Sequence, residues 1–421
     1  MLIFAFKNNL QMSQILSANK PQNTVFSILF AISFAHLLND LIQAIIPAVY
    51  PILKQNYDLT FAEIGLITFA FQLTASIFQP FVGYYTDKRP KPFSQIYGML
   101  FSAFGILMLS FADSLPFIIL SVMFVGLGSS IFHPEASRIS NLASGGKRGL
   151  AQAIFQVGGN LGTAIAPLLV AAIVVPNSQK YIVYFLIIAT LGLVVLSKIA
   201  FWYSNNLQQK LFAKAFHTNH NLSKKQVNIA IGILLFVIFS KFMYSAGIST
   251  FYTFYMIEKF ELSIQQAQIH TFIYFMAYTV GTLIGGFLGD KFGRKYIILF
   301  SVFGATPFTF MLPYANLFYT DVLMIIIGLI MSSAFPAIIV YAQELLPKKI
   351  GMISGLFYGF GFGMGAICSA LLGILADRTS IAFVYQVCAF VPIFGLICVC
   401  LPDMTKNLAS LNELSTSDLN S

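Results

Sequence analysis

Twelve apolar segments, each long enough to cross a bilayer, follow one another along this chain of 421 residues. A spanning helix needs about 20 apolar residues, because its backbone groups must find their hydrogen-bond partners within the helix. Charged residues make up 9% of the chain, against about 25% in soluble domains. So few charges cannot cover a water-soluble surface of this size. The sequence therefore predicts an all-α integral membrane protein.

The predicted spans form two groups of six, separated by one polar, basic segment at the midpoint. The chain start is interpreted as leading into a first membrane helix rather than a removed signal. We expect an N-terminal half at 1–202, a cytoplasmic linker at 203–227, a C-terminal half at 228–401 and a cytoplasmic tail at 402–421. The predicted spans are 25–50, 64–85, 94–112, 117–138, 150–175, 182–202, 228–256, 269–289, 296–314, 321–343, 351–376 and 381–401.

The basic residues predict the orientation of these spans. With both termini placed in the cytoplasm, 18 lysines and arginines lie at or near the cytoplasmic side and 4 lie outside. Lys198 and Lys241 fall within spans. This is the distribution of the positive-inside rule. The net charge of +9 is thus a sign of topology, and no nucleic-acid partner is expected.

The two groups of spans repeat one another. The stretch GYYTDKR (83–89) resembles GFLGDKF (286–292), so that Asp87 and Asp290 are equivalent, and SSIF (129–132) resembles SSAF (332–335). Twelve spans in two repeated halves are typical of secondary transporters, which bind their substrate near the bilayer midplane between the halves. The partners expected are a small-molecule substrate and the lipid bilayer, with the protein acting as a monomer.

The stretch GFLGDKFGRK (286–295) resembles the cytoplasmic loop signature of the major facilitator superfamily. The matching positions are Gly286, Asp290, Gly293, Arg294 and Lys295. The resemblance implies that the carboxylate and its basic partners stabilise one state of a gate. The first copy keeps Gly83 and Asp87 but lacks the second glycine and the Arg-Lys pair, which leaves the role of Asp87 open.

Longer stretches at 36–51, 65–92 and 128–160 resemble bacterial exporters of phosphonate antibiotics in the same superfamily. That resemblance implies a multi-pass protein of the bacterial inner membrane that confers antibiotic resistance by efflux, through proton antiport and alternating access. A facilitator or symporter of an anionic or sugar-like metabolite stays open as the alternative.

Polar residues recur at helical spacing inside several spans. His36, Asn39, Asp40 and Gln43 stand at i, i+3, i+4 and i+7 of the first span, and Gln72 and Gln156 belong to similar stripes in the second and fifth. A polar stripe that faces lipid would be costly, so we expect these stripes to face a central cavity. Hydrogen bonding between helices, without a ligand, is the other interpretation.

Ionisable groups within spans mark proton or substrate paths. Asp40 and Glu135 are the proton-coupling candidates, and His36 and His133 could relay protons, because imidazole titrates near neutral pH. The other candidates for substrate binding are Lys241, Arg138 and Tyr244, besides Asn39, Gln43, Gln72 and Gln156. Glu135 and Arg138 stand at i and i+3 and could instead form a fixed ion pair. Asp40 would then be the leading proton site.

The sequence lacks the complete motifs that would indicate a zinc deaminase or an ATP-driven pump. The His-Pro-Glu at 133–135 matches the start of a zinc deaminase signature, but the required Pro-Cys-x-x-Cys is absent. No phosphate-binding G-x-x-x-x-G-K-[ST] loop occurs. We therefore expect no enzyme activity, no cofactor and no metal. In the alignment of the two halves, His133 is unmatched beside Pro134, which predicts a π-bulge or kink there.

Overall fold

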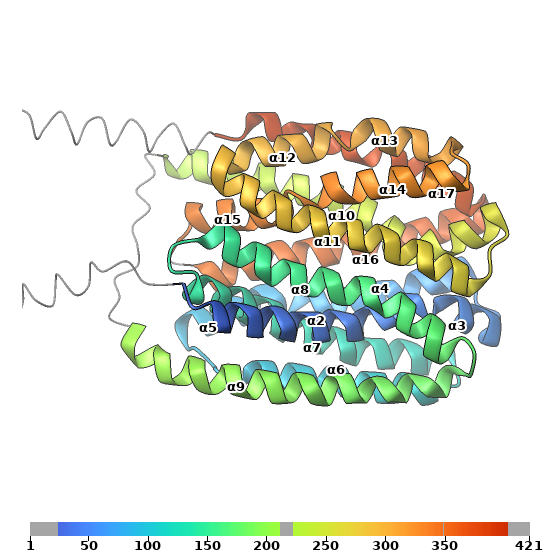
Figure 1. The fold of residues 1–421 in the computed structure, drawn as a ribbon, viewed down its shortest axis with the longest axis horizontal. Helices are drawn as coiled ribbons and strands as arrows, with labels where there is room; N and C mark the ends of the chain where they lie inside the picture. Colours follow the sequence, from blue (N-terminus) through green and yellow to red (C-terminus); the bar gives the residue numbers. More distant parts are fainter. Residues whose placement is uncertain (1–23, 211–221, 348, 403–421) are drawn as a thin grey trace, which may run out of the picture.

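The computed structural model describes residues 24–210, 222–347 and 349–402, without the side chains of 207–210 and 290. Within these ranges the chain is helical and contains no β-strand. Twelve of the described helical segments are long and apolar enough to cross a membrane. They run side by side as one elongated bundle (Figure 1). The predicted all-α class with twelve spans is confirmed.

The helices of the first half alternate in direction between the two ends of the bundle. We call the end where the chain enters and leaves the terminal end, and the opposite end, where α3 lies, the far end (Figure 1). The elements are α2 (Phe26–Ala48), α3 (Tyr50–Tyr57), α4 (Phe61–Ile77), α5 (Gln79–Lys88), α6 (Ser94–Phe111), α7 (Leu115–Ala143), α8 (Arg148–Leu169), the π-helical turn η1 (Val170–Val174), the 3₁₀ helix η2 (Gln179–Phe185) and α9 (Leu186–Lys210).

The second half follows the same up-and-down course. Its elements are α10 (Lys224–Phe260), α11 (Ile264–Phe292), α12 (Arg294–Phe303), α13 (Thr306–Met311), the 3₁₀ turn η3 (Leu312–Tyr314), α14 (Leu317–Ser332), α15 (Phe335–Leu345), α16 (Ile350–Arg378), α17 (Ile381–Ala389) and the 3₁₀ helix η4 (Val391–Cys400).

One far-end turn shows how the repeated sequence specifies repeated structure. The connection into α4 has Asp58 in the left-handed region, followed by the capping box of Thr60 with Glu63. The connection into α11 repeats it with Glu261 left-handed and the capping box of Ser263. In each case the left-handed residue ends one helix and the box satisfies the first amides of the next.

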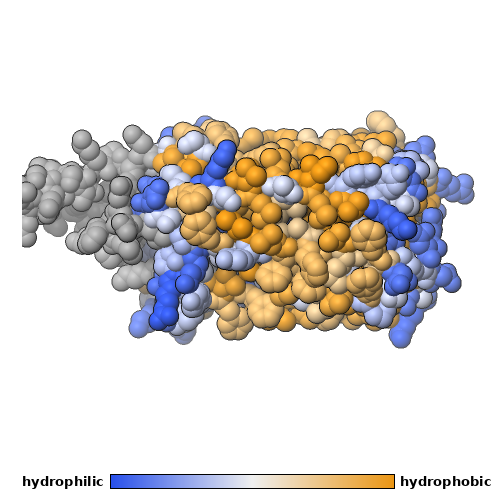
Figure 2. All heavy atoms as spheres, turned by 90° about the horizontal axis from the view of Figure 1, so that it is seen from below, coloured by the Kyte–Doolittle hydropathy of each residue, from blue (hydrophilic) through white to orange (hydrophobic). Residues whose placement is uncertain are grey.

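The lateral surface of the bundle is apolar. Figure 2 shows a broad hydrophobic belt between two polar end faces. Large side chains on this belt, among them Phe81, Ile187 and Phe287, are more than 60% exposed. Since a water-soluble protein rarely shows so large an apolar surface, this belt is the surface that faces lipid.

The two halves meet mainly along two helix pairs. Helix α16 packs along α4 and α5, and α11 packs along α8. The backbone of α16 touches that of α4 near the far end and that of α5 near the terminal end. A Cβ on Gly65 would lie 2.6 Å from the carbonyl oxygen of Ser369, and one on Gly83 would collide with the carbonyl of Gly351. Small residues thus allow the halves to touch along the whole pair.

The structure corrects one local prediction and extends others. Helix α7 runs unbroken through His133 and Pro134, so the predicted π-bulge is wrong. The interruption lies in the second half, at 333–334 between α14 and α15. Helix α9 extends to Lys210 and α10 begins at Lys224, so both enter the predicted linker. Residues 211–221 of that linker and residues 403–421 of the predicted tail lie outside the described ranges.

Candidate functional site

A cavity of about 210 Å³ lies between the two halves. Its wall is formed by α2, α4, α7 and α8 from the first half and by α10, α11, α15 and α16 from the second. On α2 the lining runs from His36 to Ala48, which is the part of that helix nearer the far end. The cavity therefore starts near mid-bundle and extends towards the far end.

The two sides of the cavity differ in chemistry. The first half contributes its ionisable groups and several amides, while the second half contributes hydroxyls, aromatic rings and the amide of Gln268. Among the described residues, the lining holds no lysine or arginine. The polar lining residues are His36, Asp40, Gln43, Tyr50, Thr68, Gln72, His133, Gln156, Asn160, Thr163, Ser245, Ser249, Thr250, Thr253, Gln268, Thr271, Tyr278 and Tyr358.

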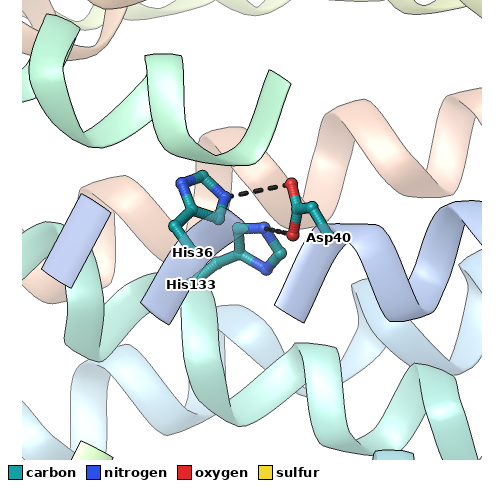
Figure 3. A group of neighbouring side chains, drawn as sticks. All are labelled: His36, Asp40 and His133. Carbon is teal, nitrogen blue, oxygen red and sulfur yellow. Dashed lines mark ion pairs between the residues drawn. The ribbon is translucent and has the colours of Figure 1, made fainter. Parts of the chain in front are cut away.

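The ionisable groups of the wall form one cluster of two histidines around a carboxylate (Figure 3). Nε2 of His36 lies 3.0 Å from Oδ2 of Asp40, and Nε2 of His133 lies 3.5 Å from Oδ1. Oδ1 also accepts hydrogen bonds from the amides of Asn39 and Gln43, at 2.9 and 3.1 Å. Both histidines are buried, and the side chain of Asp40 is 19% exposed.

Hydrogen bonding outside the cluster orients both imidazole rings. Nδ1 of His36 lies 2.8 Å from the carbonyl oxygen of Phe155. A carbonyl oxygen only accepts, so this Nδ1 carries a hydrogen. Nδ1 of His133 lies 3.2 Å from both the carbonyl oxygen and the hydroxyl of Ser129, and a hydroxyl can donate or accept. In both rings Nε2 faces Asp40.

The cluster also has the spacing of a metal site, because its three ligand atoms lie within 4.8 Å of one another. The 3.0 Å contact between His36 and Asp40 is also that of a direct hydrogen bond or ion pair, which needs no metal ion. The role of these residues in proton coupling stays a prediction.

A second buried network lies closer to the terminal end, outside the cavity lining. The guanidinium of Arg138 contacts the carboxylates of Glu135 and Asp87, at 3.1 and 2.8 Å. It also donates to the carbonyl of Thr86 at 2.5 Å and to that of Gly83 at 3.3 Å. Glu135 and Arg138 thus form the internal ion pair that their spacing allows, while Asp40 faces the cavity.

Asp87 connects this network to the other half. Its two carboxylate oxygens accept hydrogen bonds from the backbone amides of Gly351 and Met352, at 3.1 and 2.8 Å. These are first-turn amides of α16, a helix whose own N-cap residue, Lys349, makes no side-chain cap. Asp87 therefore caps α16 from across the interface, as the favourable end of the helix dipole allows.

Further polar contacts close the terminal end between the halves. The hydroxyls of Ser137 and Ser354 lie 3.1 Å apart, and Gln343 donates to the hydroxyl of Ser137 at 3.3 Å. The hydroxyl of Tyr358 donates to Gln156 at 2.5 Å and accepts from Gln152 at 3.1 Å. The cavity is thus sealed from the terminal end by several layers of hydrogen bonds.

The structure separates the residues predicted for proton coupling and for substrate binding into two groups. His36, His133, Gln43, Gln72 and Gln156 line the cavity, as does Asp40. Asn39 touches it only through Asp40. The remaining candidates, Arg138, Lys241 and Tyr244, are buried outside the lining.

The two candidates on α10 face the interior of the second half. The ammonium of Lys241 donates to the carbonyl oxygen of Met331 at 2.9 Å. The hydroxyl of Tyr244 is buried and, within the described residues, has no hydrogen-bond partner. A role for either residue in substrate binding stays a prediction, and it requires a conformation other than this one.

The second copy of the loop signature lies at the junction of α11 and α12. Arg294 forms an ion pair of 2.6 Å with Glu344 of α15, and Gly293 has a positive φ of 95°, which explains glycine there. A Cβ on Gly286 would collide with that of Ala153 on α8, so Gly286 is an interface residue. Lys295 lies in the first turn of α12. The side chain of Asp290 is outside the described part of the structure.

Three residues that bond the halves to each other escaped the sequence reasoning. Tyr358 and Gln343 join the halves, and Asp377, at the end of α16, contacts the start of α4. A buried polar residue in the tenth or eleventh span was a usable signal for the first two. Asp377 stands in a short polar connection where charged residues are common, so nothing distinguished it.

A bundle of membrane-length helices in two repeated halves around a polar cavity defines the class of membrane transporters. The chain belongs to the Major Facilitator Superfamily, whose family model matches residues 32–232 and 233–416. It is a transporter, and not an enzyme.

Relatives agree with this assignment. The chain is 52% identical over 381 residues to the fosmidomycin resistance protein of Escherichia coli (strain K12), covering 90% of this chain and 94% of that one. It is 43% identical over 393 residues to an uncharacterized MFS-type transporter, YfnC, of Bacillus subtilis (strain 168), covering 93% and 96%. A solved structure, the MFS transporter FucP in the outward conformation, matches with a TM-score of 0.65 over 90% of this chain and 98% of that one. At 14% identity, FucP shows the fold alone.

Proposed function

We propose that this transporter exports a small drug of the fosmidomycin (phosphonate antibiotic) type in exchange for protons, by alternating access. The observation that carries the proposal is the cluster of His36, Asp40 and His133 in the cavity wall. The name of the relative with 52% identity supports the substrate. The cluster supports the coupling ion, because it gathers ionisable groups where substrate would bind.

In the proposed cycle, substrate and proton alternate at Asp40. An ionised Asp40 accepts a strong, charge-assisted hydrogen bond from a donor group of the substrate, and protonation of Asp40 weakens that bond. With no lysine or arginine in the described lining, the phosphonate is held by the imidazoles of His36 and His133 and by neutral donors. The fixed pair of Glu135 and Arg138 takes no proton in this cycle.

The proposed setting is the bacterial inner membrane, with the protein acting as a monomer and both termini in the cytoplasm. The excess of lysine and arginine on the predicted cytoplasmic segments supports this orientation. The terminal end of the bundle is then the inner face, and the far end is the outer face. In this orientation the cavity lies nearer the outside, behind a thick inner gate.

The test is transport into everted membrane vesicles. Vesicles with an acidic interior should accumulate fosmidomycin, and the entry of substrate should release protons from the vesicle at a measurable rate. Dissipating the pH gradient should stop the accumulation. If the vesicles acidify normally but accumulate no fosmidomycin, fosmidomycin is not a substrate. If they accumulate it without any movement of protons, the transporter is not a proton antiporter.

A second candidate function has one specific observation in its favour. A cavity lined by hydroxyls, amides and aromatic rings, without lysine or arginine in its described lining, suits a neutral hydroxylated compound as well as an acid. A facilitator or symporter of a sugar-like or anionic metabolite would use it. In a symporter, proton and substrate would bind together, so that lowering the pH would raise substrate affinity instead of reducing it.

A further inference from the structure

Asp377, in the last turn of α16, is bonded to the other half of the molecule at the far end. Its two carboxylate oxygens accept hydrogen bonds from the backbone amides of Phe61 and Ala62, at 2.9 and 2.8 Å. These are the first two residues of α4. The neighbouring amide, of Glu63, is satisfied locally by Thr60. Asp377 thus completes the cap of a helix that belongs to the opposite half.

This contact mirrors the one made by Asp87. Asp87 ends the α4–α5 pair and caps the start of α16, whereas Asp377 ends α16 and caps the start of α4. The two antiparallel segments therefore hold each other at both ends by the same device. The device uses the affinity of a carboxylate for a helix N-terminus.

The two closures differ in strength. At the terminal end Asp87 is half-buried, pairs with Arg138 and lies beside the hydrogen bonds of Ser137, Gln343 and Tyr358. At the far end Asp377 is exposed, and the described residues give it no cationic partner. The other polar bond between the halves there is that of Gln268 to the carbonyl of Ala48, at 2.8 Å. The far-end gate is the one with fewer bonds to break.

We propose that Asp377 is the latch of the far-end gate. When its carboxylate leaves the amides of Phe61 and Ala62, water replaces it and the start of α4 separates from α16. The cavity then opens at the far end while the terminal end stays closed. This inference concerns the gate alone and holds whatever compound is transported.

The experiment measures access to the cavity from each side of the membrane. The probe is Ser249→Cys, a lining position, in the full-length protein with the four native cysteines, Cys368, Cys388, Cys398 and Cys400, replaced by serine. A membrane-impermeant maleimide is added to vesicles of either orientation. With Asp377→Ala, labelling from the far-end side should be faster by roughly five- to tenfold, the effect of one lost helix cap. Asp377→Asn, which keeps one acceptor oxygen, should lie in between.

Two comparisons make the result specific. Asp113→Ala removes an exposed carboxylate from another far-end connection, between α6 and α7, and should leave the rate unchanged. Asp87→Ala should raise labelling from the terminal side instead. A disulfide between Ala62→Cys and Asp377→Cys should block labelling from the far side and transport alike, and a reductant should restore both.

Equal far-side labelling rates for the parent and Asp377→Ala would overturn the proposal. So would free labelling through the intact disulfide, which also decides the matter if Asp377→Ala does not fold. Neither outcome would bear on which drug is exported, because cysteine labelling tests the latch whereas the vesicle assay tests the substrate.

Discussion

His36 and Asp40 stand one helical turn apart on α2, with Nε2 of the imidazole 3.0 Å from Oδ2 of the carboxylate. The other nitrogen of the ring is held by the carbonyl of Phe155 on α8. The carbonyl on α8 therefore holds the ring so that its other nitrogen faces an acid on its own helix, α2, as the proposed proton relay requires.

Replacing Asp40 tests the coupling site. Asp40→Asn keeps the shape of the side chain but cannot bind or release a proton. We expect proton-driven accumulation of fosmidomycin to fall to the level of vesicles without the protein, while the exchange of labelled for unlabelled substrate continues. Asp113→Asn, at an exposed far-end carboxylate, should behave as the parent does. Undiminished uphill export by Asp40→Asn would remove Asp40 from the mechanism.

Two substitutions of His36 separate its two nitrogens. The amide of His36→Asn can still donate to the carbonyl of Phe155 but no longer reaches Asp40. The amide of His36→Gln reaches towards Asp40 but gives up the hydrogen bond to that carbonyl. A lost hydrogen bond costs about 0.5–1.5 kcal/mol, so thermal unfolding in detergent should show Gln as the less stable variant. Proton release on substrate binding should be lost in both, because neither amide titrates.

The pair of Glu135 and Arg138 should govern stability more than coupling. Removing one member of a buried pair costs about 3–5 kcal/mol, since the other charge stays buried without a partner. Arg138→Gln should therefore lower the unfolding temperature strongly, and the double variant with Glu135→Gln should recover part of the loss. A Glu135→Gln variant that folds but no longer couples protons to export would instead place Glu135 on the proton path.

The substitution Gly83→Ala tests how closely the halves pack at the terminal-end gate, without changing any charge. The added methyl of Gly83→Ala would collide with the carbonyl of Gly351, and such overpacking costs about 1–3 kcal/mol. We expect the terminal end to close less often, which cysteine labelling from that side would detect as a faster rate. Gly232→Ala is the matched control, because nothing lies within 4 Å of its added methyl. Identical labelling of both variants would contradict the close contact.

Lys241 is one of the residues whose predicted role in substrate binding is still open. Its ammonium faces the carbonyl of Met331 outside the cavity lining, so Lys241→Met should bind substrate as the parent does. Because an isolated buried charge is costly, the variant should also unfold at a higher temperature. A loss of substrate affinity in equilibrium binding would show that Lys241 reaches the ligand in another conformation.

The sequence predicted those features that depend on residues close together in the chain. Spans follow from apolar length, and the contact of His36 with Asp40 follows from their spacing on one helix. Depth along a helix was also predictable, but the direction of a side chain was not. Lys241 stands one turn before Ser245 and two turns before Ser249, both of which line the cavity, yet its ammonium turns to the carbonyl of Met331.

Contacts between helices that are distant in the sequence could not be predicted from it. His133 reaches Asp40 only through the packing of α7 against α2, and Asp377 finds α4 across the interface. The failed π-bulge at Pro134 has a related cause. A one-residue shift between repeats shows that the two copies differ, but not which copy is irregular.

The composition of the cavity has an electrical consequence. With no permanent cation in its described lining, the net charge that crosses the bilayer in each proposed antiport cycle is the charge of the exported cargo less that of the protons carried the other way. Moving one elementary charge across 100 mV is worth about 2.3 kcal/mol. For a cargo of known charge, the current per molecule transported across a voltage-clamped membrane would therefore give the number of protons exchanged in each cycle.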